Sequence, residues 1–308
     1  MSHKLDPQAQ DLLDVIGAAG MAPIHTLPVA EARERMRATL IGGGEPPALT
    51  RVEDLSLPSA TGPLGLRLYR PCEGTLPIAL FLHGGGWMLN DLDTHDDLCR
   101  RLARRSRWLF ASLDYRRAPE HKHPAPVEDA LIAYRWLLDN ARLLGGDPHR
   151  IALVGESSGA TIAASLGLLL RDGGAPMPIY QALAYPIMDT SENWPSRGER
   201  SHGYTLDIPQ VRWYLANYLA PGQDSSSPYL FPLIGNDLSG LPPTLVMTAE
   251  YDPLRDEGIA FADKLAHARV AVERFHAEDQ MHGFLMLGRV VDRAAQLVDR
   301  LADALASR

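Results

Sequence analysis

The stretch that decides the fold is Ile151-Ala152-Leu153-Val154-Gly155-Glu156-Ser157-Ser158-Gly159. Its first four residues form an apolar run typical of a buried strand, and an alanine- and leucine-rich helical pattern follows it. Between them, Gly155–Gly159 fits the G-x-S-x-G pattern of a nucleophile elbow, in which a serine occupies a strained strand-to-helix turn. The same letters also fit an ordinary turn between a strand and a helix. The strand before and the helix after favour the catalytic interpretation.

Within this elbow, Ser157 is the predicted nucleophile. Glycines on either side permit close backbone packing, and the helix that starts beneath the serine favours negative charge near its oxygen. Ser158 is the competing serine, but it would need glycine at position 156, where the chain has Glu156.

Outward from the elbow, short apolar runs alternate with segments of helical periodicity. Strands are predicted at Pro77–Leu82, Leu109–Leu113, Ile151–Val154, Tyr180–Tyr185, Thr244–Thr248 and Val270–Phe275. Helices are predicted near 96–105, 127–141, 159–171, 256–267 and 288–305. Strand–helix alternation with nearly continuous apolar strands indicates an α/β protein whose parallel sheet is covered on both faces.

A glycine loop directly follows the first of these apolar strands. It reads His83-Gly84-Gly85-Gly86-Trp87. Glycines can turn their backbone N–H groups outward without obstruction by side chains, which suits the binding of a negatively charged oxygen. The loop fits neither the G-K-[ST] ending of a P-loop nor the G-x-G-x-x-G pattern of a dinucleotide site. An oxyanion hole is therefore predicted here.

The serine needs a histidine base and a carboxylate that orients it, and both should follow the serine along the chain. Asp252 lies at the turn after the strand Thr244–Thr248 and is the predicted acid, with Asp256 and Glu250 as alternatives. His282, in a loop after the last predicted strand, is the predicted base, and His276 is its nearest competitor.

Together these motifs resemble the hormone-sensitive-lipase-like family of α/β-hydrolase esterases, over nearly the whole chain. The resemblance rests on residues 83–87, 114–120, 155–159, 252–256 and 282–284. It implies a mostly parallel eight-stranded sheet flanked by helices. It also implies a single domain with a core of about 50–186 and 231–308 and a helical cap of about 1–45 and 187–230.

For the site, the resemblance implies an oxyanion hole made by Gly84, Gly85 and the amide of Ser158, and a substrate pocket that includes Trp87 and Phe284. Two positions depart from the usual family pattern. Glu156 stands where Asp or Thr is more frequent, and Arg117 stands where leucine is usual.

The expected activity is that of a serine carboxylesterase acting on short- to medium-chain acyl esters, a small-molecule substrate class. Amides, lactones, acetylated sugars and lipase substrates are the alternatives within this chemistry. A ligand receptor on the same fold is the alternative outside it, although the intact triad argues against a receptor. Because the base must be neutral, activity should fall as the pH drops below about 6.5.

Composition mainly excludes partners. The 308 residues carry 30 basic and 38 acidic side chains, a net charge of −8 that argues against nucleic acid. The two cysteines have no metal-ligand spacing, so neither a metal nor a cofactor is expected. The longest mostly apolar run, Ile162–Leu170, is too short to span a membrane. A cytoplasmic location is expected, and a homodimer through the strand Val270–Phe275 is considered.

Overall fold

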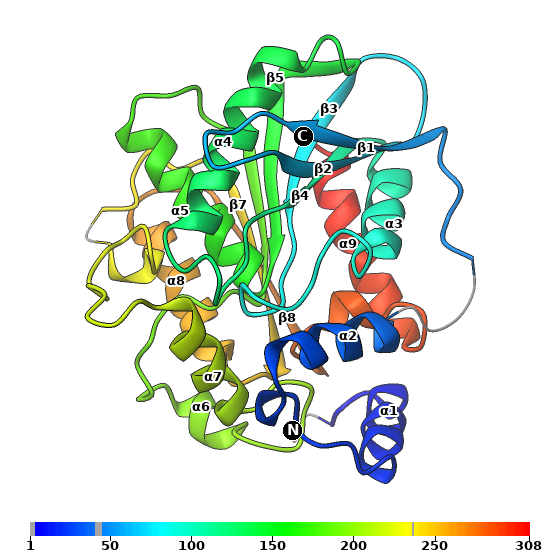
Figure 1. Cartoon of the computed structure of the whole chain (residues 1–308), viewed down its shortest axis with the longest axis vertical. Coiled ribbons are helices and arrows are strands. Elements are labelled where there is room, and N and C mark those ends of the chain that lie inside the picture. Colours follow the sequence, from blue (N-terminus) through cyan, green and yellow to red (C-terminus); the bar gives the residue numbers. More distant parts are fainter. Residues whose placement is uncertain (1–3, 41–44, 236) are drawn as a thin grey trace.

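One eight-stranded sheet organises the molecule, with the strand order β1-β2-β4-β3-β5-β6-β7-β8 (Figure 1). The structure is a computed structural model that describes residues 4–40, 45–235 and 237–308. β2 runs antiparallel to both of its neighbours, and β3 to β8 are parallel to one another and to β4. The strands are β1 (Arg51–Leu57), β2 (Leu64–Arg70), β3 (Leu76–Leu82), β4 (Leu109–Asp114), β5 (Gly146–Glu156), β6 (Tyr180–Ala184), β7 (Thr244–Tyr251) and β8 (Val272–Met281).

The central strands are apolar where they cross the core because both faces of the sheet are covered there. Every residue of β3 is buried. Side chains alternate across a strand, so Leu80 and Leu82 enter the core on one face while Ala79 and Phe81 enter the core on the other. This arrangement explains why the middle of the sheet could be recognised from continuous apolar runs.

Helices pack on both faces of the sheet. In Figure 1, α4, α5 and α8 lie on one side, and α3 and α9 lie on the other. The helices are α1 (Pro7–Ala18), α2 (Val29–Leu40), α3 (Asp96–Ser106), α4 (Ala125–Asn140), α5 (Ser158–Asp172), α6 (Pro195–Glu199), α7 (Ile208–Tyr218), α8 (Arg255–His267) and α9 (Asp292–Ala306). Short 3-10 turns occur at Ile24–Thr26, Pro232–Ile234 and Phe284–Leu287.

The two segments predicted to form a cap supply the remaining helices. The first segment holds α1 and α2, and the second holds α6 and α7. Figure 1 shows all four helices gathered at one end of the sheet. Residues 1–3 and 41–44 of the predicted cap lie outside the described part of the chain.

The strand boundaries differ from the sequence prediction at the edges of the sheet. β8 begins at Val272 and continues to Met281, six residues beyond the predicted end. β1 and β2 were not predicted individually. All three contain charged residues. β1 and β8 are the edge strands, which leave one side open to solvent and need no continuous apolar run, and β2 lies between β1 and β4.

Candidate active site

Ser157 stands in a strained turn between β5 and α5. Its φ of 53° and ψ of −126° are unusual for a residue with a side chain. The turn is packed tightly against β3, since a Cβ added at Gly159 would lie 2.0 Å from the carbonyl oxygen of Leu82. Backbone strain of this kind costs on the order of 1–3 kcal/mol and persists only where the surroundings enforce it. The local sequence thus presents one serine on a rigid support.

A continuous hydrogen-bonded chain links Ser157 to His282 and Asp252. Ser157 Oγ lies 2.9 Å from His282 Nε2, and His282 Nδ1 lies 2.8 Å from Asp252 Oδ2. A carboxylate oxygen only accepts, so Nδ1 carries the proton and, in the neutral ring, Nε2 is free to accept the serine proton. Asp252 is fully buried, and His282 is 8% exposed.

The topology explains how residues so far apart in sequence meet. Ser157 follows β5, Asp252 follows β7 and His282 follows β8, and these parallel strands end at the same edge of the sheet. The Asp252 carboxylate is fixed in place because its second oxygen accepts the N–H of Leu254 at 2.8 Å. The carboxyl edge of a parallel sheet is where α/β proteins generally place their ligand sites.

The alternative acids and the alternative base form a separate network. His276 Nε2 lies 3.2 Å from Glu250 Oε2. The other carboxylate oxygen of Glu250, Oε1, accepts hydrogen bonds from Arg200 and Arg255. Asp256 accepts from Arg255 and from the N–H of Ser196. These side chains tie α6 to the end of β7 and the start of α8.

The glycine loop after β3 lies against the elbow, but its first amide is already engaged. The N–H of Gly84 donates to Glu156 Oε1. In the parts of the chain that the structure describes, no acceptor takes the N–H of Gly85 or Gly86. The N–H of Trp87 donates to Ser158 Oγ at 3.1 Å, so the hydroxyl of Ser158 holds the loop against α5.

None of the three loop glycines has room for a side chain. A Cβ at Gly84 would lie 2.0 Å from Glu156 Oε1, one at Gly85 would lie 2.8 Å from the backbone nitrogen of Asn90, and one at Gly86 would lie 2.2 Å from the ring of Tyr214 in α7. Gly86 also has a φ of +60°. The contact between Tyr214 and the loop was not predicted from the sequence, because it joins residues well over a hundred positions apart.

Trp87 and Phe284, the predicted pocket residues, are both buried among aromatic rings. Trp87 stacks on Tyr218 with 4.1 Å between ring centroids, and Phe231 meets it edge-on. Phe284 packs edge-on against Tyr185, whose ring also contacts His282. Their contacts with these neighbouring rings make both residues part of the walls behind the site.

Burial and neighbouring charges shift the protonation of two groups beside the loop. Burial, with a smaller contribution from neighbouring His95, lowers the pKa of His83 to about 3. Burial alone would raise the pKa of Glu156, but the hydrogen bond and charge of His95 outweigh it and leave that pKa below its usual value. At neutral pH, His83 is therefore neutral and Glu156 is ionised.

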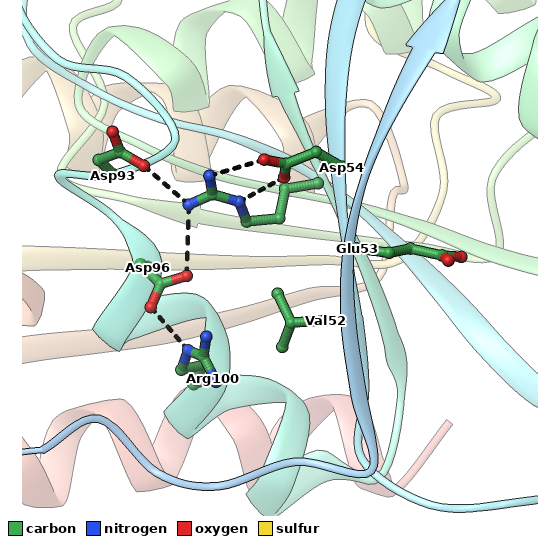
Figure 2. A pocket seen from close by; sticks show the side chains of 7 residues that line it. Val52, Glu53, Asp54, Asp93, Asp96 and Arg100 are labelled. Atoms are coloured by element: carbon green, nitrogen blue, oxygen red, sulfur yellow. Dashed lines mark hydrogen bonds and ion pairs between the residues drawn. The ribbon is translucent and has the colours of Figure 1, made fainter.

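A separate pocket of about 460 Å³ lies away from the elbow, between β1, β2 and the start of α3 (Figure 2). Arg67 lines this pocket and pairs with Asp54, Asp93 and Asp96. Asp96 also pairs with Arg100, as Figure 2 shows. Both arginines of the pocket are thus paired with carboxylates, which makes it an ion-pair network.

The described residues contain no cluster of histidine, cysteine, aspartate or glutamate that could hold a metal ion. Over the same residues, no helix has both the length and the apolar character needed to cross a membrane.

The chain matches a known protein family and several of its characterised relatives. The family model for the alpha/beta hydrolase fold matches residues 79–286. The chain is 38% identical to carboxylesterase NlhH of Mycobacterium tuberculosis, over 98% of this chain and 95% of the relative. It is 34% identical to an ethyl acetate hydrolase of Pseudomonas putida, over 98% of each chain.

Solved structures resemble this fold as well. A hyperthermophilic esterase from Pyrobaculum calidifontis superposes with a TM-score of 0.92 at 38% identity, covering 99% of this chain and 98% of that one. The elbow, the order of its motifs and these likenesses together show that this chain belongs to the hormone-sensitive-lipase-like family of α/β-hydrolase carboxylic ester hydrolases.

Proposed function

We propose that this protein is a serine carboxylesterase that hydrolyses short- to medium-chain acyl esters through an acyl-enzyme intermediate. The observation that carries the proposal is the hydrogen-bonded chain from Ser157 through His282 to Asp252. The relatives named as a carboxylesterase and an ethyl acetate hydrolase support the ester as substrate.

In this mechanism His282 moves one proton in each half-reaction. Nε2 takes the proton of Ser157 as Oγ attacks the ester carbonyl, and it then gives that proton to the departing alcohol. Water, activated by the same nitrogen, attacks the acyl-enzyme and releases the acid. Asp252 stays ionised and stabilises the imidazolium that forms in each step.

The oxyanion donors in this proposal are the amides of Gly85, Gly86 and Ser158. The sequence prediction included the Gly84 amide among the oxyanion donors. Because this amide donates to Glu156, we propose the Gly86 amide as a donor in its place. Ser158 is the first residue of α5, and the N–H groups at a helix start have no acceptor within the helix. Donors held in advance around a developing negative charge supply a large part of the rate enhancement in such enzymes.

The preference for short to medium acyl chains rests on the aromatic side chains around the loop. Tyr214 packs on Gly86, and Trp87 is enclosed by Tyr218 and Phe231. These rings fill space that a long chain would need. Because Tyr214 and Tyr218 lie on α7, we also propose that α1, α2, α6 and α7 act together as the cap.

A homodimer through the open edge of the sheet stays a prediction. β8 lies at one edge of the sheet: it pairs with β7 on one side, and its other side is open to a second strand. Sedimentation velocity over a range of concentrations tests it: a monomer at all concentrations would contradict this assembly.

Hydrolysis of p-nitrophenyl esters from acetate to palmitate tests the proposed activity. We expect the highest kcat/KM between acetate and octanoate and a loss of turnover in Ser157→Ala. Ser165→Ala is the matched control, because that hydroxyl lies in α5, the helix that follows Ser157, is buried and has no hydrogen-bond partner among the described residues. Turnover that survives in Ser157→Ala would contradict the mechanism, and a preference for palmitate would contradict the chain-length assignment.

A further inference from the structure

A buried histidine–carboxylate pair lies directly behind the glycine loop. Glu156, the residue before the nucleophile, accepts the N–H of Gly84 on Oε1, and the same oxygen lies 3.0 Å from His95 Nε2. His95 is fully buried, and Glu156 is 4% exposed. Neither side chain has a place in the proton transfers described above.

The hydrogen bonds of His95 hold its ring at both nitrogens. Nε2 faces a carboxylate oxygen, which only accepts, so Nε2 carries a proton and donates to Glu156. Nδ1 lies 3.0 Å from Thr94 Oγ1, which also accepts the N–H of Asp91 at 2.9 Å and lies 2.8 Å from the carbonyl oxygen of Asp91. The ring is therefore fixed between Thr94 and the Glu156 carboxylate.

The pair is anchored on its far side by the N-terminal segment. Asp91 accepts from the N–H of Thr94 at 3.0 Å and from Arg37 of α2 at 2.6 Å. Arg117 donates to the carbonyl of Asn90 at 2.8 Å. A continuous series of polar contacts thus runs from α2 to the loop that follows β3.

We propose that the hydrogen-bonded His95–Glu156 pair positions the Gly84 amide, and with it the oxyanion donors of Gly85 and Gly86, relative to Ser157. The inference rests on the proposed esterase function. A charge-assisted hydrogen bond to the carboxylate fixes the loop more firmly than a neutral acceptor would. Both residues act through the loop and touch no substrate.

Charge explains why the carboxylate needs the histidine. An unpaired negative charge one residue before Ser157 would oppose the developing oxyanion, and burial strengthens that opposition. The Nε2–H of His95 gives the buried carboxylate a hydrogen-bond donor and leaves it able to accept the Gly84 N–H as well. A glutamate is thereby tolerated beside the elbow.

Substitution of Glu156 by glutamine removes the charge and keeps the size. Displacement of preorganised groups by a fraction of an ångström to 1 Å reduces rates by up to about 100-fold. For Glu156→Gln we expect kcat about 10- to 100-fold lower, with KM near the wild-type value. His95→Gln should lower kcat at least as much, and the double variant should lose less than the product of the two single losses, because the two residues act as one unit.

An inhibitor that forms an oxyanion separates positioning from a purely structural role. A trifluoromethyl ketone adds to Ser157 as a tetrahedral anion, whereas the product carboxylic acid does not. In Glu156→Gln we expect the Ki of the ketone to rise in proportion to the loss of kcat/KM, and the Ki of the product acid to stay unchanged. Asp129→Asn, a buried carboxylate that pairs with Arg116, is the control: it should lower the unfolding midpoint and leave both Ki values unchanged.

Nitrogen-15 NMR of the wild-type protein tests the contact between the two side chains directly. A proton on His95 Nε2 that is protected from exchange with solvent, assigned by its loss in His95→Gln, supports the inference. An unprotonated Nε2, or a Glu156→Gln enzyme with wild-type kcat and ketone affinity, overturns it. If the wild-type protein hydrolyses no ester, the proposed function fails, and the NMR result still decides the hydrogen bond between His95 and Glu156.

Discussion

At the scale of single residues, Asp252 is distinguished from nearby carboxylates by what it contacts. Asp252 meets the Nδ1–H of His282, whereas Asp256 meets Arg255 and the backbone of Ser196. The aspartate in a triad holds the imidazole in the tautomer that can accept the serine proton, and replacing it by asparagine favours the wrong tautomer.

We therefore expect Asp252→Asn to lower kcat about 1,000- to 10,000-fold while the fold is retained. Asp256→Asn is the matched variant, and its kcat should stay near the wild-type value. Steady-state kinetics with p-nitrophenyl butyrate and circular dichroism check both. Comparable losses in the two variants would mean that Asp252 has no special role.

His83 provides a pH-dependent contribution to stability. Its folded-state pKa is about 3 because of burial, and an unfolded histidine has a pKa of about 6.5. Between these values the unfolded chain binds one more proton at this site, so the free energy of unfolding falls as the pH falls, by up to about 1.4 kcal/mol per pH unit.

His83→Asn keeps a donor near the Gly84 carbonyl, which accepts from His83 Nδ1 at 2.8 Å, and removes the titrating ring. Urea unfolding between pH 4 and 6 should then show a shallower slope of stability against pH, by about one proton. An unchanged slope would show that His83 is protonated in the folded protein.

At the scale of elements, the contact between α7 and the loop after β3 leaves no space for a side chain at position 86. An alanine there would meet the Tyr214 ring and would adopt a φ of +60°, which costs roughly 1–2 kcal/mol. Either effect displaces an oxyanion donor. We expect Gly86→Ala to lower kcat/KM about 100-fold or more.

Gly17→Ala in α1 is the matched control, because a Cβ there meets nothing within 4 Å and the position is helical. Combining Gly86→Ala with Tyr214→Ala should recover part of the activity, since it removes the collision and leaves the backbone strain. Wild-type kcat/KM in Gly86→Ala would exclude this loop as the oxyanion hole.

The sequence predicted the elements in the middle of the sheet better than those at its edges. β3, β7 and the part of β5 from Ile151 onward are largely apolar because they are covered on both faces, and Ser157 and Asp252 directly follow β5 and β7. The polar first residues of β5, from Gly146, were not predicted. β8 carries charged side chains on its open side, so the predicted strand ended too early, although His282 was still found in the loop beyond it.

The contacts around the loop could not be predicted, because no local spacing encodes them. Glu156 and His95 are 61 residues apart, and their meeting depends on the neighbouring positions of β3 and β5 in the sheet. The hydrogen bond from the Gly84 amide to Glu156 joins residues 72 positions apart, so nothing in the sequence indicated it when Gly84 was counted among the oxyanion donors.

At the scale of the whole molecule, segments from both ends of the chain converge on one edge of the sheet. The N–H of Asp6 donates to the carbonyl of Asp279 in β8 at 2.9 Å. Arg33 of α2 donates to the carbonyls of Met88 and Ala118 at 2.7 and 2.9 Å. The N-terminal segment is thus fastened to the strand that leads to His282 and to the segment after the glycine loop.

The central claim is that one serine, Ser157, carries the acyl group. Stoichiometric labelling with paraoxon tests it most directly, because this phosphate triester releases one p-nitrophenolate as it phosphorylates an activated serine. We predict one p-nitrophenolate per chain, a diethylphosphoryl group on Ser157 in the peptide mass spectrum, and loss of esterase activity in proportion to labelling. Label on Ser158 or elsewhere, or full esterase activity in completely labelled protein, would contradict the account.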